Sequence, residues 1–316
     1  MASFINLLKN EHMKLFKRTG TMVMVAVMLL AVLGAGAVSK FMINPDTQSD
    51  WQAELEAENI QFENMLDESN QTSAEQERMQ EQLALNNYRL ENNKPPVNSE
   101  TLWGFMIDAS NLTGLAALFT IVAASSILAH EFSQGTIKLL LIRPVKRSKI
   151  LQSKYVTAMM FSGMLLVLIF AFSFLTGSLL FGFHGIDQSH LVYQEGRVVE
   201  QPMFMYVAQL FSLNSVEVLM MGTFAFMVAA IFKNSSFAIG ISIFLLFTGP
   251  QLVQVLNDYG WAKYILFAHT NLQQYIHGTP IVEGMTFSFS ISMLVIYFVI
   301  FLTLAWISFE KRDVTA

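Results

Sequence analysis

Six long apolar runs constrain this 316-residue chain more than any other feature, because each is long enough to cross a lipid bilayer as a helix. The first, Thr21–Met42, has 22 residues and spans ~33 Å as a helix, against a hydrocarbon core of ~30 Å. Charged residues make up only 14% of the chain, whereas a soluble protein carries about 25%. The sequence therefore predicts an all-α polytopic membrane protein. Its six predicted spans are Thr21–Met42, Trp103–His130, Tyr155–Phe183, Tyr206–Phe232, Phe237–Val255 and Phe287–Phe309.

The first run is predicted to be an uncleaved span rather than a signal peptide, since a secretory apolar region is shorter and ends at a small-residue cleavage site. An even number of spans puts both termini on one side of the membrane. Thirteen of the 19 Lys and Arg residues then share that side, and such residues stay in the cytoplasm. We expect a multi-pass protein of a bacterial plasma membrane with both termini cytoplasmic. The predicted cytoplasmic segments are 1–20, 131–154, 233–236 and 310–316, and the predicted outer segments are 43–102, 184–205 and 256–286.

The large outer segment, 43–102, carries 13 acidic and three basic residues. Apolar residues recur at helical spacing in Asp50–Leu66 and again beyond Ser73, and Pro95 and Pro96 end the second stretch. This pattern predicts an acidic helical hairpin above the bilayer, and the alternative is a largely solvated, partly disordered loop. The negative charge suggests an external ligand or protein partner at 43–102, such as a cationic peptide or an envelope component.

The two other outer segments give weaker signals. Residues 184–205 show no strong pattern. Residues 256–286 contain an apolar piece, Trp261–Ala268, that is too short to cross a membrane. Because aromatic residues surround this piece, we predict a re-entrant or interfacial helical segment before the last span.

Several classes of chemistry lack their signatures in this chain. It has no cysteine, which excludes disulfides and thiolate metal sites. It has no P-loop, no His-Glu-x-x-His motif, no clustered histidines and no Gly-x-Ser-x-Gly turn. Its spans hold no paired carboxylates or Ser/His constellation, which argues against an intramembrane enzyme. We therefore expect no catalytic residue, metal or cofactor in this chain, and no nucleic-acid partner.

The predicted cytoplasmic segment 131–154 is the most specific part of the sequence. Six of its 24 residues are basic, yet Ile137–Ile142 is amphipathic, which suggests a structured loop that contacts another molecule in the cell. The alternatives are a passive linker and, for each basic residue, simple anchoring of the topology or contact with anionic lipid.

The skeleton of this loop is Glu131, Gly135-Thr136, Leu140, Pro144-Val145, Arg147, Ile150 and Lys154. It resembles the loop of permease subunits of ABC transporters of the second exporter class, the ABC-2-type permeases. Lys146 departs from the family, which usually has a small hydroxyl residue there. Weaker matches are the tight turn Lys233–Ser236 and the closing Phe309–Asp313. The resemblance covers nearly the whole chain apart from 43–102.

This resemblance implies that the loop forms a coupling helix that docks onto a separate ABC ATPase subunit, present in two copies, which carries the ATP and magnesium. It also implies a second permease copy or a related permease. The amphipathic segment Phe4–Arg18 corresponds to an elbow helix along the inner membrane surface that borders the ATPase. The residues expected to couple to the ATPase are Glu131, Gly135, Thr136, Leu140, Arg143, Pro144, Arg147 and Lys154.

Three polar residues inside the predicted spans are candidates for a substrate path or a subunit interface: Glu217, Asn214 and Asp108. Burying such groups in lipid is costly, so they mark functional positions by default. The alternatives are that Tyr206–Ser215 is an interfacial helix that leaves Glu217 near water, and that Asp108 is an acid at a helix start.

The predicted function is that of a membrane subunit of an ATP-driven exporter that forms the translocation path. The alternative is a non-transporting subunit that acts as a sensor or mechanotransmitter through its outer hairpin. A substrate path is needed only for the first.

Overall fold

The computed structural model describes residues 4–41, 51–67, 73–133, 146–183, 185–194, 196–276 and 280–311. Within these ranges the chain is mostly helical, and six helical segments are long and apolar enough to cross a membrane, as the sequence predicts. They are α2 (Thr19–Phe41), α5 (Leu102–Ser110) continued by α6 (Thr113–Ser133), α8 (Arg147–Phe181), α9 (Met203–Phe232), α10 (Ser235–Val255) and α12 (Phe287–Glu310).

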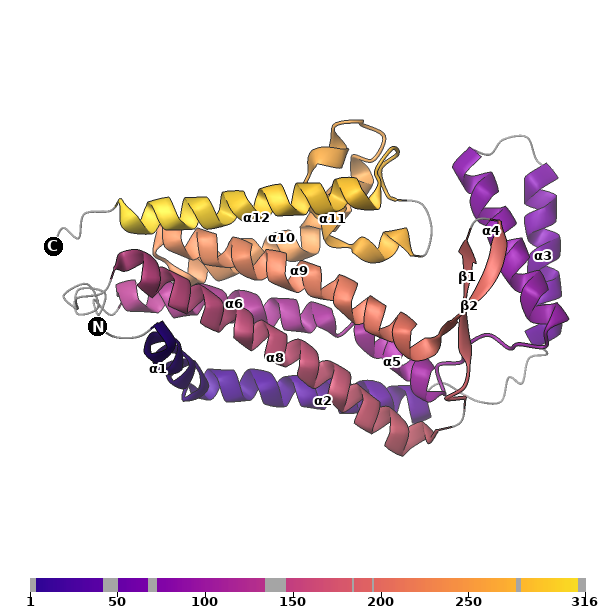
Figure 1. The fold of residues 1–316 in the computed structure, drawn as a ribbon, viewed down its shortest axis with the longest axis horizontal. Coiled ribbons are helices and arrows are strands. Elements are labelled where there is room, and N and C mark those ends of the chain that lie inside the picture. Colours follow the sequence, from indigo (N-terminus) through magenta and orange to yellow (C-terminus); the bar gives the residue numbers. More distant parts are fainter. Residues whose placement is uncertain are drawn as a thin grey trace.

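The helices are arranged as an inner pair, α6 and α9, surrounded by the others (Figure 1). In the most apolar stretches, 67% of the α5–α6 segment and 61% of α9 are buried, against 22–28% of the other four. The inner pair approaches closely at Gly222, where an added Cβ would lie 2.5 Å from Cγ2 of Thr120. The outer helices instead expose large apolar side chains such as Leu30, Val167 and Phe247, which suits contact with lipid.

The two ends of the helix body carry different structures (Figure 1). One end holds α1 (Phe4–Phe16), the end of α6, the start of α8 and the last turn of α12. The other end holds α3 (Trp51–Asp67), α4 (Ser73–Glu91), β1 (Ser189–Gln194) and β2 (Arg197–Pro202). The described residues between α10 and α12 include the short helices η1 (Ala262–Tyr264), α11 (Phe267–Thr270) and η2 (Leu272–Tyr275).

Helices α3 and α4 pack antiparallel through asparagine side chains rather than through a large apolar interface. Asn86 donates to Oδ1 of Asn59 at 3.0 Å and to Oε2 of Glu58 at 3.1 Å, and Asn59 donates to Oδ1 of Asn87 at 2.9 Å. Asn59 and Asn86 are both buried. Because buried amides must find partners, these contacts fix the register of the two helices.

The expectation of an all-α protein is wrong in one segment. Residues 184–205 were predicted as a loop without a pattern, but β1 and β2 form a two-stranded antiparallel sheet in which Leu191 faces Glu200 and Val192 faces Val199. Gly196 has φ of +81°, which lets the chain reverse between the strands. Alternating side chains over a short run give only a weak strand signal in a sequence this apolar.

The second predicted span, Trp103–His130, is broken into α5 and α6 at Asn111 and Leu112. The carbonyl of Ser110 accepts from Thr113 Oγ1 at 2.6 Å and from Asn214 Nδ2 at 3.1 Å. The backbone turns tightly here, since the N–H of Leu112 bonds to the carbonyl of Ala109 at 3.0 Å. Two side chains thus donate to the Ser110 carbonyl, which in a continuous helix would accept from a backbone N–H one turn later.

The predicted segment 131–154 overlaps helices at both of its ends. Helix α6 continues to Ser133 and α8 begins at Arg147, so Glu131 and Lys154 lie within helices. The basic side chains near the start of α8 predicted a loop because charged residues rarely enter a membrane. In the structure the most buried of them, Lys154, forms ion pairs with Glu11 and Glu131.

Candidate functional site

A buried ion cluster joins three helices at the end of the body where α6 ends and α8 begins. Nζ of Lys154 lies 2.8 Å from Oε2 of Glu11 and 3.1 Å from Oε1 of Glu131. It also donates to the carbonyl of Ile127 at 3.3 Å. Lys154 is fully buried, and Glu11 and Glu131 are 6% and 8% exposed. All three hydrogens of the ammonium group therefore have acceptors, which a buried ammonium requires.

Each member reaches the cluster because of its position on a helix. On α1, the buried residues are Leu7, Glu11 and Leu15, which repeat every four residues and form one face. Leu15 belongs to the main apolar core, so the same face that buries α1 delivers Glu11 to Lys154. Glu131 is in the last turn of α6 and Lys154 is in the third turn of α8, on opposite sides of the intervening loop.

Lys14 completes the cluster at its solvent side. Its Nζ lies 3.1 Å from Oε1 of Glu131 and 3.5 Å from Oε1 of Glu11, and its side chain is 50% exposed. Burial opposes its charge, but the carboxylates of Glu11 and Glu131 outweigh burial and raise the pKa of Lys14. Two carboxylates thus face two ammonium groups, so the charges of these four side chains balance one another.

Of the eight residues predicted to contact an ATPase, three lie in the described part of the chain. Glu131 and Lys154 meet in the ion cluster. Arg147, the first residue of α8, donates from Nη1 to the carbonyl of Glu310 at 3.4 Å, which places it at the last turn of α12. The other five, Gly135, Thr136, Leu140, Arg143 and Pro144, lie outside the described residues.

The sequence-based prediction missed Glu11 and Lys14. The amphipathic segment Phe4–Arg18 was expected to lie along the membrane surface, and it forms α1 with a turn at Lys17 and Arg18. A signal was present, because the spacing of Leu7, Glu11 and Leu15 puts a carboxylate on the apolar face of a helix. An acidic residue at such a position needs a buried cation.

Among the intramembrane candidates, Asn214 has a clear structural role. Its Nδ2 donates to the carbonyl of Ser110 at 3.1 Å, and its Oδ1 accepts from Gln273 Nε2 at 2.7 Å. It therefore ties the break between α5 and α6 to η2. Asp108 is exposed on α5, and the structure does not bring it into this set of contacts.

Glu217 lies in the middle of the 30-residue helix α9. The alternative of a separate interfacial helix at Tyr206–Ser215 is wrong, because these residues belong to the same continuous helix. Its side chain is half-buried, and over the ranges given above its carboxylate has no hydrogen bond or ion pair. No group of three or more His, Asp and Glu side chains with the geometry of a metal site occurs among the described residues.

A second polar network, the clasp, ties α4 to the β1–β2 sheet at the opposite end of the body. Glu200 of β2 pairs with Lys94 and accepts from Tyr88 at 2.8 Å and from Ser189 at 2.7 Å. Hydrogen bonds from Lys94, Ser189 and Tyr88 together lower the pKa of Glu200 to about 2. Because β2 ends at Pro202 and α9 begins at Met203, the clasp connects α4 directly to the start of an inner helix.

Comparison with known proteins places the chain among relatives whose activities are not assigned. The family model described as "Protein of unknown function (DUF2705)" matches residues 78–315. The "Uncharacterized protein YhcI" of Bacillus subtilis (strain 168) is 42% identical over 313 residues, which are 98% of this chain and 99% of the relative. The "Uncharacterized membrane protein YdbK" of the same organism is 34% identical over 218 residues, 68% of this chain and 84% of the relative.

Proposed function

The chain belongs to the DUF2705 family of proteins of unknown function, and we propose that it is the membrane-spanning subunit of an ATP-driven exporter. In this proposal a separate ABC ATPase binds the loop between α6 and α8 on the cytoplasmic side. A second copy of the chain, or a related permease, completes the translocation path. The loop carries the motif that resembles ABC-2-type permeases, from Gly135 to Arg147.

The single observation that supports this proposal best is the ion cluster of Glu11, Lys14, Glu131 and Lys154. A loop that transmits force needs both of its ends attached to stiff elements, because a flexible attachment would absorb the motion. Glu131 and Lys154 join those two ends directly at 3.1 Å, and Glu11 adds α1 to the same unit. A displacement of the loop would therefore move α1, α6 and α8 together.

Contacts further along the chain would carry this displacement to the other helices. Arg147 touches the last turn of α12 through the carbonyl of Glu310. The hydroxyls of Tyr155 on α8 and Thr223 on α9 are 2.9 Å apart. Rigid packed helices with a few polar ties move as bodies rather than deform, which is what alternating access requires.

The sidedness on which the proposal depends is directly measurable, because the chain contains no cysteine. A single cysteine at Lys149 or at Glu63 gives one labelling site without background. We expect a membrane-impermeant maleimide to label the Glu63→Cys protein in intact cells and the Lys149→Cys protein only after permeabilisation. Labelling of Lys149→Cys in intact cells would refute the proposal.

The coupling role is tested with an ABC ATPase that co-purifies with the tagged chain from its native host. We expect the double charge reversal Arg143→Glu with Arg147→Glu, and separately Gly135→Trp, to uncouple ATP hydrolysis from transport while the protein still inserts. The docking surface would lose its charge complementarity in the first variant, and the second would place a bulky side chain where the sequence predicts that glycine turns the chain.

Lys263→Glu is the matched control, since it reverses one charge in the segment between α10 and α12, on the proposed outer side. It should leave hydrolysis and ATPase co-purification unchanged. Normal coupling and unchanged co-purification in the loop variants would contradict the docking role, and so would a purified chain that is active without any nucleotide-hydrolysing companion.

A second candidate function, a sensor or mechanotransmitter, is favoured by the clasp between α4 and the sheet. The Lys94–Glu200 pair connects the α3–α4 hairpin to β2 and so to α9. ATPase cycling that moved α9 would thereby move the hairpin without any substrate. Transport assays in reconstituted vesicles distinguish the sensor from the exporter. Deletion of Trp51–Asn92 should abolish signalling by a sensor, whereas an exporter would still move its substrate.

A further inference from the structure

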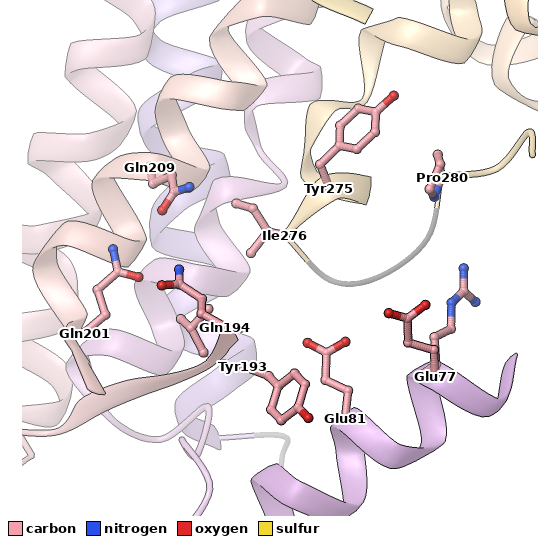
Figure 2. A pocket seen from close by; sticks show the side chains of 11 residues that line it. Glu77, Glu81, Tyr193, Gln194, Gln201, Gln209, Tyr275, Ile276 and Pro280 are labelled. Carbon is pink, nitrogen blue, oxygen red and sulfur yellow. The ribbon is translucent and has the colours of Figure 1, made fainter. Parts of the chain in front are cut away.

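A cavity of about 450 Å³ lies between the α3–α4 hairpin and the helix body, and the ion cluster and the clasp take no part in it. Figure 2 shows Glu77 and Glu81 of α4 on one side, with Tyr193 and Gln194 of β1 beside them. Gln209 of α9 and residues near η2 lie across the opening. Sites for small organic ligands have volumes of about 300–1,000 Å³, so the cavity is large enough to hold one.

The charge of the lining favours a cation. Glu77 and Glu81 are one helical turn apart, and Figure 2 shows both carboxylates directed toward the cavity. Neither forms an ion pair with any residue in the described ranges, in contrast to Glu200 with Lys94. Burial, followed by repulsion from Glu77, raises the pKa of Glu81. Among the described residues of the lining, Arg78 is the one basic side chain, so the two carboxylates outnumber it.

The rest of the lining offers hydrogen bonds and flat aromatic surfaces. Gln194, Gln201 and Gln209 each carry an amide that both donates and accepts, which matches the needs of a peptide backbone. Tyr193 and Tyr275 present rings, and a ring face attracts an ammonium or guanidinium group. Tyr275 supplies only its ring, because its hydroxyl is engaged 2.5 Å from Oγ of Ser290 on α12 and points away from the cavity.

We propose that this cavity binds a short basic peptide, with an ammonium or guanidinium group held by Glu77 and Glu81 and the peptide amides held by the three glutamines. Under the proposed function, such a peptide is the class of molecule that an exporter or sensor would meet on its outer face. This biological role rests on the proposed function, whereas binding of the peptide to the cavity does not. The acidic excess of segment 43–102, 13 acidic against three basic residues, would attract such a ligand over a longer range.

The test measures binding to the full chain in nanodiscs of phosphatidylcholine, a zwitterionic lipid that does not itself attract basic peptides. Three probes are titrated by calorimetry: acetyl-Lys-Ala-Lys-amide, spermidine, and acetyl-Gln-Ala-Gln-amide. The lysine peptide should bind most tightly, because it alone has both charge and amides. Spermidine should bind at least threefold more weakly, and the glutamine peptide should not bind in the same range. Empty nanodiscs give the background.

Variants assign the binding to this cavity. Glu81→Gln should weaken binding of the lysine peptide about tenfold, equivalent to about 1.4 kcal/mol, and Glu77→Gln with Glu81→Gln should weaken it further. Tyr275→Phe keeps the ring and should stay within about twofold of the unaltered chain. Glu63→Gln is the matched control, since Glu63 is an exposed glutamate of α3 outside the lining, and it should bind normally.

The inference would be overturned by no binding of the lysine peptide to the unaltered chain, by equal binding of all three probes, or by unchanged binding in the Glu77/Glu81 double variant. Spermidine binding as tightly as the peptide would also overturn it, because the glutamines would then contribute nothing. None of these results involves ATP. Failure here would leave the coupling proposal intact, and loss of ATPase coupling would leave a measured binding site intact.

Discussion

The two ends of the molecule each hold an ion-paired network that joins segments far apart in the sequence, and the networks differ in burial. At one end, Lys154 is fully buried between Glu11 and Glu131. At the other, Lys94 and Glu200 are 35% and 37% exposed in their side chains. Both networks add further hydrogen bonds to their ion pairs.

The difference in burial teaches what each network is suited for. A buried charge that loses its partner has no water to replace it, so the ion cluster must stay assembled during any movement. An exposed pair exchanges its partner for water at little cost, so the clasp can open and close. The first therefore suits a rigid joint and the second suits a releasable contact.

The largest effect is expected from Lys154→Met, which takes away the buried ammonium group that both Glu11 and Glu131 contact. Breaking a buried ion pair costs about 3–5 kcal/mol. We expect a large drop in the thermal unfolding midpoint in detergent, or failure to accumulate in the membrane.

Two further proteins make this result specific. Lys149→Met removes an exposed lysine from the first turn of the same helix and should change the midpoint little. Combining Lys154→Met with Glu11→Gln and Glu131→Gln removes the uncompensated charges and should recover much of the lost stability. Equal effects of Lys149→Met and Lys154→Met would erase the distinction between buried and exposed networks.

An intermediate effect is expected from Asn214→Leu, which breaks a neutral polar tie among the apolar helices. The variant leaves the Gln273 amide without its acceptor at 2.7 Å and removes one of two donors to the Ser110 carbonyl. Side-chain hydrogen bonds between membrane helices contribute about 0.6–1.7 kcal/mol each. Unfolding in detergent should show a loss of this order, and Ser212→Leu, an exposed neighbour on α9, serves as the control.

A smaller, pH-dependent effect is expected from Glu200→Gln in the clasp. The folded-state pKa of Glu200 is lowered to about 2, so its stabilising contribution is complete above the usual carboxyl range and is lost as the pH falls toward 2. The difference in unfolding midpoint between Glu200→Gln and the unaltered chain should therefore be present at pH 7 and shrink between about pH 4.5 and about 2. A difference that grows on acidification would show that the carboxylate is not held by Lys94.

The smallest effect, and one of opposite sign, is expected from Glu81→Gln. Burial and the nearby Glu77 raise the pKa of Glu81, so its ionised form is disfavoured in the folded protein and its penalty appears as the pH rises above the usual carboxyl range. Like charges at this helical spacing destabilise by about 0.2–0.5 kcal/mol. The variant should be slightly more stable at pH 7 but not near pH 4, although it binds a basic peptide less well.

The six apolar helices were predictable because the bilayer sets their length, and length is visible in a single sequence. Two features were not. The start of α8 at Arg147 looked like loop because its basic residues suggest an end to the span, and the partners of Lys154 lie on other helices. The break after Ser110 depends on Asn214, 104 residues later, which no local pattern reveals.

The candidate site was predictable in part. Glu131 and Lys154 came from the resemblance of the loop, and the structure pairs them. Their pairing with Glu11 was missed because periodicity places a residue on a helix face but does not say which helix covers that face. The peptide cavity was beyond reach for the same reason, since its lining comes from α4, both strands, α9 and the segment around η2.

The pairing of Glu11 with Lys154 has a consequence for how the protein is made. The two residues are 143 positions apart, and ribosomes add about 5–20 residues per second, so Glu11 is made roughly 7–30 s before its partner exists. During that interval α1 has to wait in water or at the headgroups, and it can settle only when the third apolar helix arrives. Assembly of this end is thus a late step of biogenesis, and a truncated nascent chain that stops before Lys154 would display the first helix to protease.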